Sequence, residues 1–347
     1  MIGLALAGGG SRGAYQIGVY KALKKCHIKI DGFVGTSIGA LNAAMLASNR
    51  DKELYNLWKS INIGNIFGFS DNFISNLEKN KVNLNLIKSG LTDLKKIILN
   101  KGISLDNYRK AIKDLNIEES LYKSNKDFGL VTVKFPEFKP LYLFKDDIKP
   151  KLLNEYIIAS CYLPIFKMEK ILDNKYYLDG GFYDNIPANA LLKKGYDLVY
   201  AVNLEAIGVK RPYLDKSKVI EIKPSRNLGS ILNVNKDKIN KNIELGYFDT
   251  LKIIKKLDGY KYIFKKRSEF YYSFLLKNIK KRTLKETQTF FRTTDYKKLI
   301  IKSLEYVMKK EGYSYYEIYN PYKVIREIKK MKKKYGVYKF INQISIL

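Results

Sequence analysis

The five residues Gly35-Thr36-Ser37-Ile38-Gly39 constrain this 347-residue chain more than any other feature. The apolar run before them predicts a buried strand at 31–34, and the small-residue run after them predicts a helix at 40–47. A serine on so sharp a strand-to-helix turn has its hydroxyl exposed at the carboxyl end of a sheet. Glycines are expected at Gly35 and Gly39 because a side chain there would collide with the neighbouring strand or helix. Ser37 is therefore a candidate nucleophile, and a plain helix N-cap is the alternative.

A second glycine-rich turn lies near the start of the chain. An apolar strand is expected at 2–7, followed by Gly8-Gly9-Gly10-Ser11-Arg12-Gly13 and a helix at 14–25. Together with the strand at 31–34, these segments form a βαβ unit, which requires a parallel sheet and a right-handed crossover. The glycine turn and the serine turn both follow parallel strands, so we expect them at the same carboxyl edge of the sheet.

The glycine turn has two chemical interpretations. Gly8, Gly10 and Gly13 fit the fingerprint of a dinucleotide-binding loop, but that fingerprint also needs an acidic residue at the end of the second strand. Here the acidic residue, Asp31, stands at the beginning of that strand. In the other interpretation, successive glycines let backbone N–H groups approach and stabilise a tetrahedral oxyanion. The residues by themselves leave both open.

The rest of the chain continues as an α/β protein and then becomes helical. Residues 51–126 are expected to be mostly helical, with Trp58, Phe67, Phe69 and Phe73 as candidates for core, for an acyl pocket or for a lid. Strands are expected at 127–134 and 140–144, forming a hairpin, at 175–178, at 195–203 and at 218–222, with a helix at 149–160. Further helices are expected at 236–256, within 273–310 and at 321–334.

A serine nucleophile needs a base, and the only histidine cannot supply it. His27 lies between the first helix and the second strand, which is the amino edge of the sheet. The strand separates it from Ser37 by roughly 15–20 Å. His27 is therefore expected to sit at the end of the helix, where a cation is favourable. The base must be another group, and a carboxylate or a lysine at the same sheet edge remains open.

Charge and cysteine content indicate the setting of the chain. The net charge is +30, and residues 250–347 contribute 18 of these charges, with 26 Lys and Arg against 8 Asp and Glu. This basic region favours an anionic partner such as phospholipid or nucleic acid, while a lysine-rich composition of the whole chain is the simpler alternative.

Two cysteines, Cys26 and Cys161, form neither a disulfide framework nor a metal cluster. No signal peptide or membrane span is expected, and the predicted location is cytoplasmic, with peripheral contact to membranes.

Three motifs together resemble those of the patatin-like phospholipases. They occur in the order that this family has, over residues 1 to about 205. The matching residues are Leu6 to Val19, Gly35 to Ala40, Ala159-Ser160 with Leu163-Pro164 and Phe166, and Asp179-Gly180-Gly181 with Asn185 and Pro187. Three motifs in order are far more specific than any one alone.

The resemblance implies a three-layer α/β/α fold with a mostly parallel central sheet, and a Ser–Asp dyad that hydrolyses fatty-acyl esters of lipids. Ser37 would be the nucleophile and Asp179 the base. The N–H groups of Gly8, Gly9 and Gly10 would form the oxyanion hole, and Arg12 and Gly13 would support that loop. The remaining motif glycines are Gly35, Gly39, Gly180 and Gly181. No metal or other cofactor is implied.

The predicted organisation is a patatin-like domain at 1–225 and a helical, Lys- and Tyr-rich region at 226–347, whose role the resemblance leaves open. The predicted substrate is a lipid ester, and the predicted partner of the basic region is an anionic membrane surface. The competing function is a nucleotide- or nucleic-acid-binding protein that uses the Gly8–Gly13 loop and the basic region. A catalytically silent adaptor at a membrane surface is a third candidate, against which the intact Ser37 and Asp179 argue.

Overall fold

The computed structural model describes residues 1–60, 104–164, 166–232 and 235–345. The chain divides into two compact units, Met1–Tyr247 and Phe248–Leu347, which we call the first and the second unit. The division falls within helix α11 (Lys236–Ile254). The domain boundary expected at residue 225 stays a prediction.

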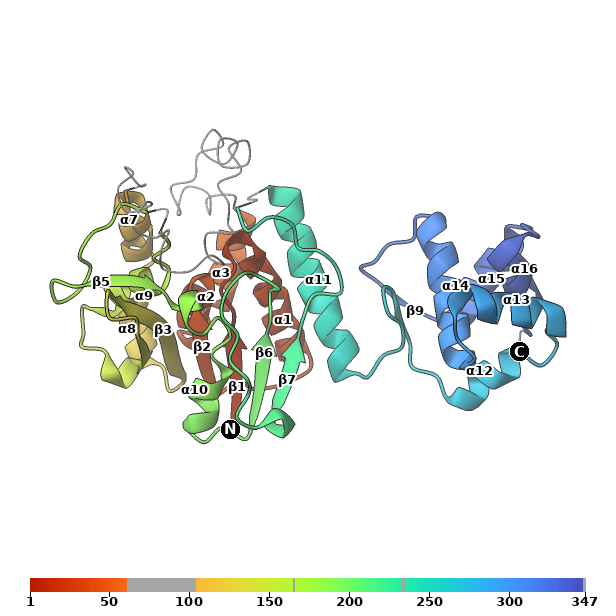
Figure 1. The fold of residues 1–347 in the computed structure, drawn as a ribbon, viewed down its shortest axis with the longest axis horizontal. Helices are drawn as coiled ribbons and strands as arrows, with labels where there is room; N and C mark the ends of the chain where they lie inside the picture. Colours follow the sequence, from red (N-terminus) through yellow and green to blue (C-terminus); the bar gives the residue numbers. More distant parts are fainter. Residues whose placement is uncertain (61–103, 165, 233–234, 346–347) are drawn as a thin grey trace. The chain divides into compact units, whose positions relative to one another are not determined.

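The first unit is built on a seven-stranded sheet, drawn in Figure 1. The strand order is β4-β3-β2-β1-β6-β7, with β5 paired to β3. Strands β3, β2, β1, β6 and β7 are parallel, whereas β4 and β5 run antiparallel to β3. The bounds are β1 (Ile2–Leu6), β2 (Gly32–Thr36), β3 (Asp127–Phe135), β4 (Lys139–Phe144), β5 (Tyr176–Asp179), β6 (Leu198–Val202) and β7 (Val219–Ile222).

The position of β5 brings two distant parts of the chain together. Strand β2 pairs with β3 as far as Thr36, opposite Val131. Strand β4 occupies the other edge of β3 over residues 129–134, so β5 must use the edge that β2 leaves open beyond Val131. There Asp179 pairs with Thr132, the residue next to Val131. The end of β5 therefore lies beside the end of β2.

Helices cover both faces of the sheet, as the glycines of β2 show. A Cβ on Gly35 would lie 2.1 Å from the Gly39 carbonyl oxygen in α2 (Ile38–Ala47). A Cβ on Gly32 would lie 1.9 Å from Tyr196 Oη, directly after α10 (Ala188–Lys193). Because side chains three residues apart in a strand point to opposite faces, α2 and α10 lie on opposite sides of the sheet (Figure 1).

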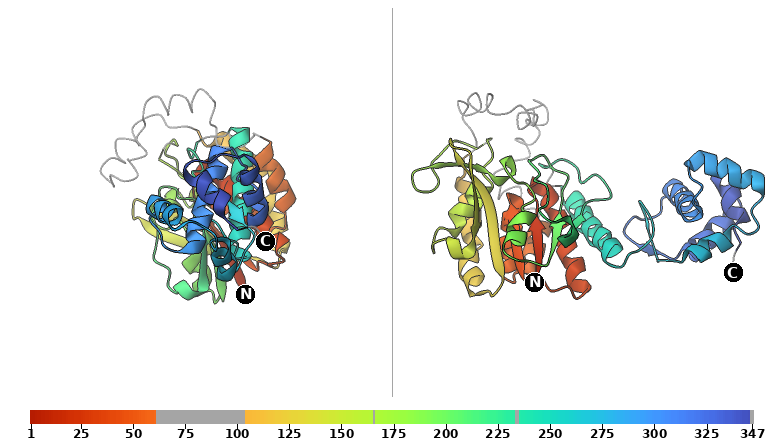
Figure 2. Two further views of the ribbon diagram at one scale, coloured as in Figure 1. Left: turned by 90° about the vertical axis from the view of Figure 1, so that its right-hand side faces the viewer. Right: turned by 60° about the horizontal axis from the view of Figure 1, so that its bottom comes forward.

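The remaining elements of the first unit lie on the edges and faces of this sheet. They are η1 (Gly10–Gly13), α1 (Ala14–Lys25), α3 (Asp51–Lys59), α7 (Asp106–Asp114), α8 (Ile117–Lys123), η3 (Lys145–Asp147), α9 (Leu153–Ser160), η4 (Gly180–Phe182) and η5 (Lys216–Lys218). The first part of α11 belongs here as well. It lies along α1, with Gly18 and Gly246 at the crossing, and a Cβ on Gly18 would stand 1.8 Å from the Ile243 carbonyl oxygen (Figure 2).

A buried polar network fixes the glycine turn to α2. The side-chain amide of Gln16 in α1 donates to the Ala7 carbonyl at 2.7 Å, just before the glycines. Asn42 in α2 donates to Gln16 Oε1 at 2.7 Å and accepts from Trp58 Nε1 at 3.0 Å. All three side chains are almost fully buried, so each hydrogen bond is needed to satisfy a polar group away from water.

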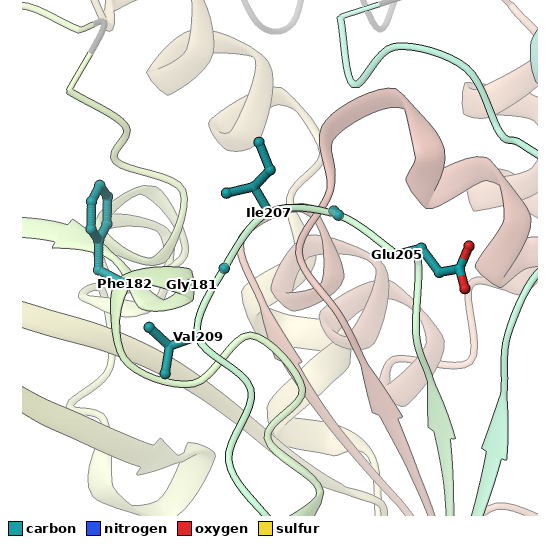
Figure 3. A pocket seen from close by; sticks show the side chains of 7 residues that line it. Gly181, Phe182, Glu205, Ile207 and Val209 are labelled. Carbon is teal, nitrogen blue, oxygen red and sulfur yellow. The ribbon is translucent and has the colours of Figure 1, made fainter. Parts of the chain in front are cut away.

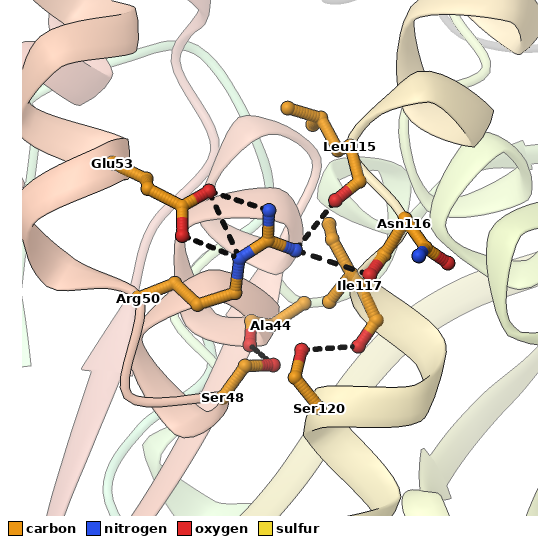
Figure 4. Close-up of polar contacts among 8 residues, drawn as sticks. All are labelled: Ala44, Ser48, Arg50, Glu53, Leu115, Asn116, Ile117 and Ser120. Atoms are coloured by element: carbon orange, nitrogen blue, oxygen red, sulfur yellow. Dashed lines mark hydrogen bonds and ion pairs between the residues drawn. The ribbon is translucent and has the colours of Figure 1, made fainter.

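Arg50 connects the start of α3 to the turn between α7 and α8, as Figure 4 shows. Its guanidinium pairs with Glu53 through two nitrogens and donates to the carbonyls of Leu115 and Asn116. Arg50 thus anchors the helices on both sides of residues 61–103. Of the aromatic residues expected to form core, an acyl pocket or a lid, Trp58 is buried in the core, and Phe67, Phe69 and Phe73 lie outside the described residues.

The predicted fold class is confirmed: the structure is α/β with a mostly parallel central sheet and a helical C-terminal region. The hairpin of β3 and β4 and the parallel strand β6 occur where expected. The helix expected from residue 149 begins later, at Leu153. Cys26 and Cys161 are the C-cap residues of α1 and α9.

The second unit is a helical module with its own core. Its elements are β8 (Ile263–Phe264), α12 (Glu269–Leu275), α13 (Lys281–Phe291), α14 (Tyr296–Lys310), β9 (Ile318–Tyr319), α15 (Pro321–Lys330) and α16 (Gly336–Gln343). Helix α14 is central, with its Leu299, Leu304 and Met308 fully buried. The short parallel pair β8–β9 was not expected from the sequence.

Candidate active site

Ser37 forms the sharp turn between β2 and α2. Its backbone has φ 56° and ψ −131°, a conformation that non-glycine residues rarely adopt. Both neighbouring glycines are required by close contact, since a Cβ on Gly39 would lie 2.2 Å from the Leu6 carbonyl oxygen. The N-terminus of α2 follows directly, and its dipole favours negative charge near the Ser37 hydroxyl.

Ser160 holds this strained turn from the end of α9. Its Oγ accepts the Ser37 N–H at 3.0 Å and donates to the Val131 carbonyl at 2.7 Å. Val131 in turn pairs with Thr36 in the sheet. Ser160 thus links the nucleophile turn to β3 through its fully buried hydroxyl. The sequence showed this residue within a motif, but gave it no role.

Asp179 ends β5 and lies 3% exposed beside the serine turn. Its Oδ1 accepts the Gly181 N–H at 2.7 Å, whereas its buried Oδ2 has no hydrogen-bond partner at ordinary geometry within the described residues. Burial raises the pKa of this carboxyl to about 6, while the neighbouring Ser37 hydroxyl and the Gly181 N–H oppose the rise. Asp179 therefore has one oxygen available for a proton and a pKa close to neutrality.

The loop after Asp179 is fixed against the end of β2. A Cβ on Gly180 would lie 2.3 Å from the Val131 carbonyl oxygen, so only glycine allows this approach. Thr36 Oγ1 donates to the Asp184 carbonyl at 2.8 Å. The Asp184 side chain is fully buried and accepts the Tyr142 hydroxyl at 2.9 Å, and burial raises its pKa to about 6. Asp184 therefore anchors the loop that carries Asp179.

Asn185 joins this loop to the glycine turn. The Gly8 N–H donates to the Asn185 carbonyl at 3.2 Å and to its Oδ1 at 3.1 Å, and a Cβ on Gly8 would meet Ser37 Cβ at 3.1 Å. Gly8 is thus close to the nucleophile, but its N–H is already used. In the part of the chain that the structure describes, the N–H groups of Gly9 and Gly10 have no acceptor. Gly9 and Gly10 are therefore the two candidates whose N–H groups are available, and the oxyanion role of this loop stays a prediction.

Arg12 and Gly13 surround the glycine turn as supports. The Arg12 guanidinium donates to Gly229 O at 2.8 Å and to Glu205 O at 2.7 Å, and burial lowers its pKa. Its charge is thus directed toward backbone carbonyls of two later loops. A Cβ on Gly13 would lie 2.9 Å from both Ile38 and Trp58, so this glycine allows the loop to pack on α2 and α3.

Cys161 and Tyr108 complete the buried surroundings of the dyad candidates. Burial and the nearby Asp179 carboxylate raise the pKa of the Cys161 thiol well above its usual value, while hydrogen bonds with Tyr108 and Ser37 oppose the rise. Cys161 therefore stays a neutral thiol beside Ser37. Nothing in the sequence placed Tyr108 here, because it comes from α7 and reaches the site only through the tertiary fold.

His27 lies far from these groups in the fold. It is exposed in the turn between α1 and β2, with φ 58°, and its N–H donates to the Lys24 carbonyl at the end of α1. Ser37 stands at the opposite end of β2. The position expected for His27, at the helix end and away from Ser37, is the one that the structure shows.

A pocket of about 450 Å³ lies against the Asp179 loop, as Figure 3 shows. Gly181 and Phe182 form one wall, and residues 205–209 form the other. Ile207 and Val209 are the apolar side chains of the second wall, and Glu205 points away from Phe182 at the far end. Because the Gly181 N–H bonds to Asp179, the pocket adjoins the candidate base.

Among the residues that the structure describes, no helix is both long and apolar enough to cross a membrane. No group of three or more His, Cys, Asp and Glu side chains there is placed to hold a metal ion.

Similar proteins include fungal and mammalian relatives. The chain is 28% identical over 214 residues to "Lysophospholipase nte1" of Aspergillus terreus, covering 61% of this chain and 12% of that protein. It is 23% identical over 211 residues to "Patatin-like phospholipase domain-containing protein 7" of Mus musculus, covering 58% of this chain and 13% of that protein. The chain thus spans about an eighth of the length of these relatives. A solved structure, VipD from Legionella pneumophila, matches 95% of this chain and 80% of its own, with 14% identity and a TM-score of 0.45.

The family model described as "Patatin-like phospholipase" matches residues 4–192. This range includes the glycine turn, the Ser37 turn, Ser160 and the loop that begins at Asp179. It also spans more than half of the chain, and so this protein belongs to the patatin-like phospholipase family.

Proposed function

We propose that this protein is a serine acyl hydrolase that cleaves fatty-acyl esters of lipids through Ser37 and Asp179. The observation that carries the proposal is the placement of a buried carboxyl, with one unpartnered oxygen, beside a serine on a strained strand-to-helix turn. Family membership and the lysophospholipase relatives support the lipid ester as substrate class.

In the proposed reaction, Asp179 Oδ2 accepts the Ser37 hydroxyl proton as Oγ attacks the ester carbonyl carbon. The N–H groups of Gly9 and Gly10 donate to the oxyanion of the tetrahedral intermediate, assisted by the N-terminal dipole of α2. The proton then passes to the departing alcohol, and an acyl-enzyme remains. Water attacks this ester with Asp179 again as base, which releases the fatty acid and restores Ser37.

The pocket beside Gly181 is proposed to receive an apolar part of the lipid. Phe182, Ile207 and Val209 present hydrocarbon to it, and Ile207 and Val209 are 40% and 42% exposed. Apolar lining with few polar groups is typical of ligand pockets of this size. An acyl chain held there would lie next to the carboxyl that activates Ser37.

Labelling with a fluorophosphonate probe tests the proposal against the nucleotide-binding alternative. We expect the probe to label Ser37 covalently, and the Ser37→Ala variant to lose the label. Ser48→Ala is the matched control: Ser48 caps the other end of α2, bonded to the Ala44 carbonyl at 2.7 Å, and its loss should leave labelling intact. A protein that binds a nucleotide through the glycine turn offers no activated serine, so an unlabelled Ser37 in folded protein would contradict the proposal.

The pH profile should report the pKa of Asp179. Only the carboxylate can accept the Ser37 proton, so we expect kcat/KM for a short acyl ester to rise about tenfold per pH unit below 6 and to level off above it. The raised pKa values of Asp179 and Asp184 make these two groups stabilise the fold as pH falls from 6 toward 3.8, and circular dichroism at each pH checks that the protein as a whole stays folded. A profile that stays flat down to pH 4.5 in folded protein would exclude Asp179 as the base.

The surroundings in which the enzyme works are part of the proposal. We propose a reducing, cytoplasmic setting, which the free thiols of Cys26 and Cys161 support. We also propose that the basic region 250–347 brings the enzyme to anionic membranes, since it contains 26 basic side chains and only 8 acidic ones. Vesicle binding that weakens as salt rises would support this contact, and salt-insensitive binding would contradict it.

A further inference from the structure

The second unit carries a pocket of about 470 Å³ where α15 ends and α16 follows. Its size is within the range of about 300–1,000 Å³ that small-ligand sites occupy. The lining side chains are all cationic or amide-bearing: Lys329, Lys332, Lys334, Lys339, Asn342 and Gln343. The pocket is thus bordered by four lysines and two amide side chains, whose hydrocarbon parts form most of its surface, and none of these six residues is acidic.

Lys332 and Lys334 line the pocket, whereas Lys333, which lies between them in the sequence, forms an ion pair elsewhere. Lys333, between Lys332 and Lys334, pairs with Glu311 at 2.6 Å. No such carboxylate faces the pocket among its lining residues. Lys329 donates to the Ile344 carbonyl at 2.6 Å, and burial lowers its pKa. Lys332, Lys334 and Lys339 are exposed and have no acidic neighbour among the lining residues, so they present positive charge that favours a polyanion at the pocket.

We propose that this lysine pocket binds a ligand with clustered phosphate groups. Lysine ammonium groups bind phosphate as point charges. The Asn342 amide donates to the Lys333 carbonyl. The Gln343 amide accepts the Lys280 N–H and donates to Thr283 Oγ1, so both amides hold the pocket wall in place. A concave site with several amines matches two or more phosphates on one small ring better than the single phosphate of an ordinary lipid. The source is either a phosphorylated membrane lipid or a soluble polyphosphate. If the ligand is a membrane lipid, the proposal rests on the proposed membrane contact, and if it is a soluble polyphosphate, it does not. In neither case does the proposal depend on the chemistry of Ser37.

The test compares two charge-matched triple variants of the full chain, both carrying Ser37→Ala so that no lipid is cleaved. The pocket variant is Lys332→Gln, Lys334→Gln and Lys339→Gln, with Lys329 kept because it holds the backbone at Ile344. The control variant is Lys285→Gln, Lys309→Gln and Lys323→Gln, three exposed lysines of the same unit outside the pocket. The probes are inositol hexakisphosphate, and phosphatidylcholine vesicles with either phosphatidylinositol bisphosphate or phosphatidylserine at equal surface charge.

We expect the pocket variant to bind inositol hexakisphosphate about tenfold more weakly or worse, and the control variant to lose much less. The same difference on phosphatidylinositol bisphosphate vesicles, but not on phosphatidylserine vesicles, assigns the ligand to a lipid headgroup. A difference on the soluble probe alone assigns it to a soluble polyphosphate.

Equal losses in the two triple variants would mean diffuse attraction by the basic surface and would overturn the proposal. A selective loss of single-stranded RNA binding in the pocket variant, with neither phosphate probe affected, would also overturn it. The pocket variant with Ser37 intact should hydrolyse a soluble short ester at the normal rate. Failure of that hydrolysis in every form of the protein would count against the proposed function and leave the phosphate result standing.

Discussion

We expect Asp179→Asn to lower kcat/KM for a short acyl ester by about 10²–10⁴-fold while the first unit stays folded. The asparagine keeps an oxygen that can accept the Gly181 N–H, which Asp179 Oδ1 accepts at 2.7 Å, but it cannot take the Ser37 proton. Ser37→Ala should remove hydrolysis at least as completely, because no acyl-enzyme forms. Initial rates with a soluble ester, with circular dichroism as a check of folding, measure both effects.

The same substitution should make the fold more stable near neutral pH. Burial raises the pKa of Asp179 from 3.8 to about 6, so its contribution to stability is complete below pH 3.8 and is lost as pH rises through 6. At pH 7.5 the native protein therefore carries a buried charge, and its removal should stabilise the first unit by up to about 3 kcal/mol. Urea unfolding at pH 7.5 measures this gain. A variant that is inactive and less stable would indicate a structural role for the carboxyl.

Asp184→Asn is the matched control for the loss of activity. Asp184 lies on the same loop, is fully buried, and also has a pKa raised to about 6 by burial. Its carboxyl faces Tyr142 rather than Ser37. We expect this variant to retain hydrolysis within about tenfold, since it removes no group from the proton transfer. Equal inactivation by the two substitutions would show that the loop, and not the Asp179 carboxyl, is what activity requires.

Gly35→Ala should prevent the first unit from folding stably. The added Cβ would lie 2.1 Å from the Gly39 carbonyl oxygen and 2.5 Å from the Ala40 nitrogen, and both are backbone atoms that cannot turn away. Either β2 or α2 must move, and we expect a loss of more than about 3 kcal/mol. Urea unfolding followed by tryptophan fluorescence measures it, because the single tryptophan, Trp58, is buried and bonded to Asn42 of α2.

Gly195→Ala controls for the change of residue type. Gly195 belongs to the same unit, and a Cβ there would meet nothing within 4 Å, although its φ of 90° disfavours alanine. We expect a loss of about 1 kcal/mol from that backbone conformation alone. If Gly35→Ala were no more destabilising than Gly195→Ala, the close approach of β2 to α2 would be wrong.

Local sequence patterns were enough for most of the sheet and for the position of the serine turn. Small residues before and after Ser37 allow only a close strand-to-helix contact, and the parallel strands β1 and β2 follow from the βαβ spacing. The same topology placed His27 at the wrong edge for catalysis. Helix starts were less certain: α9 begins at Leu153, four residues after the expected position.

Other features depended on contacts between residues far apart in the chain. Asn185 accepts the N–H of Gly8, one of the three predicted oxyanion donors, although the glycine run itself gives no sign of this contact. Tyr108 and Ser160 reach the surroundings of Ser37 from α7 and α9 by packing alone. The lysine pocket likewise exists only because the chain turns between α15 and α16.

The Ser37 turn and the motif that contains Asp179 could be identified from the sequence by itself, because each depends on residues adjacent in the chain. Their meeting was decided by the tertiary structure. It depends on β5 taking the edge of β3 that β2 leaves free beyond Val131, which sets Asp179 opposite Thr132. The raised pKa of Asp179 also depends on the tertiary structure, because the elements packed around Asp179 bury it and thereby disfavour its charged form.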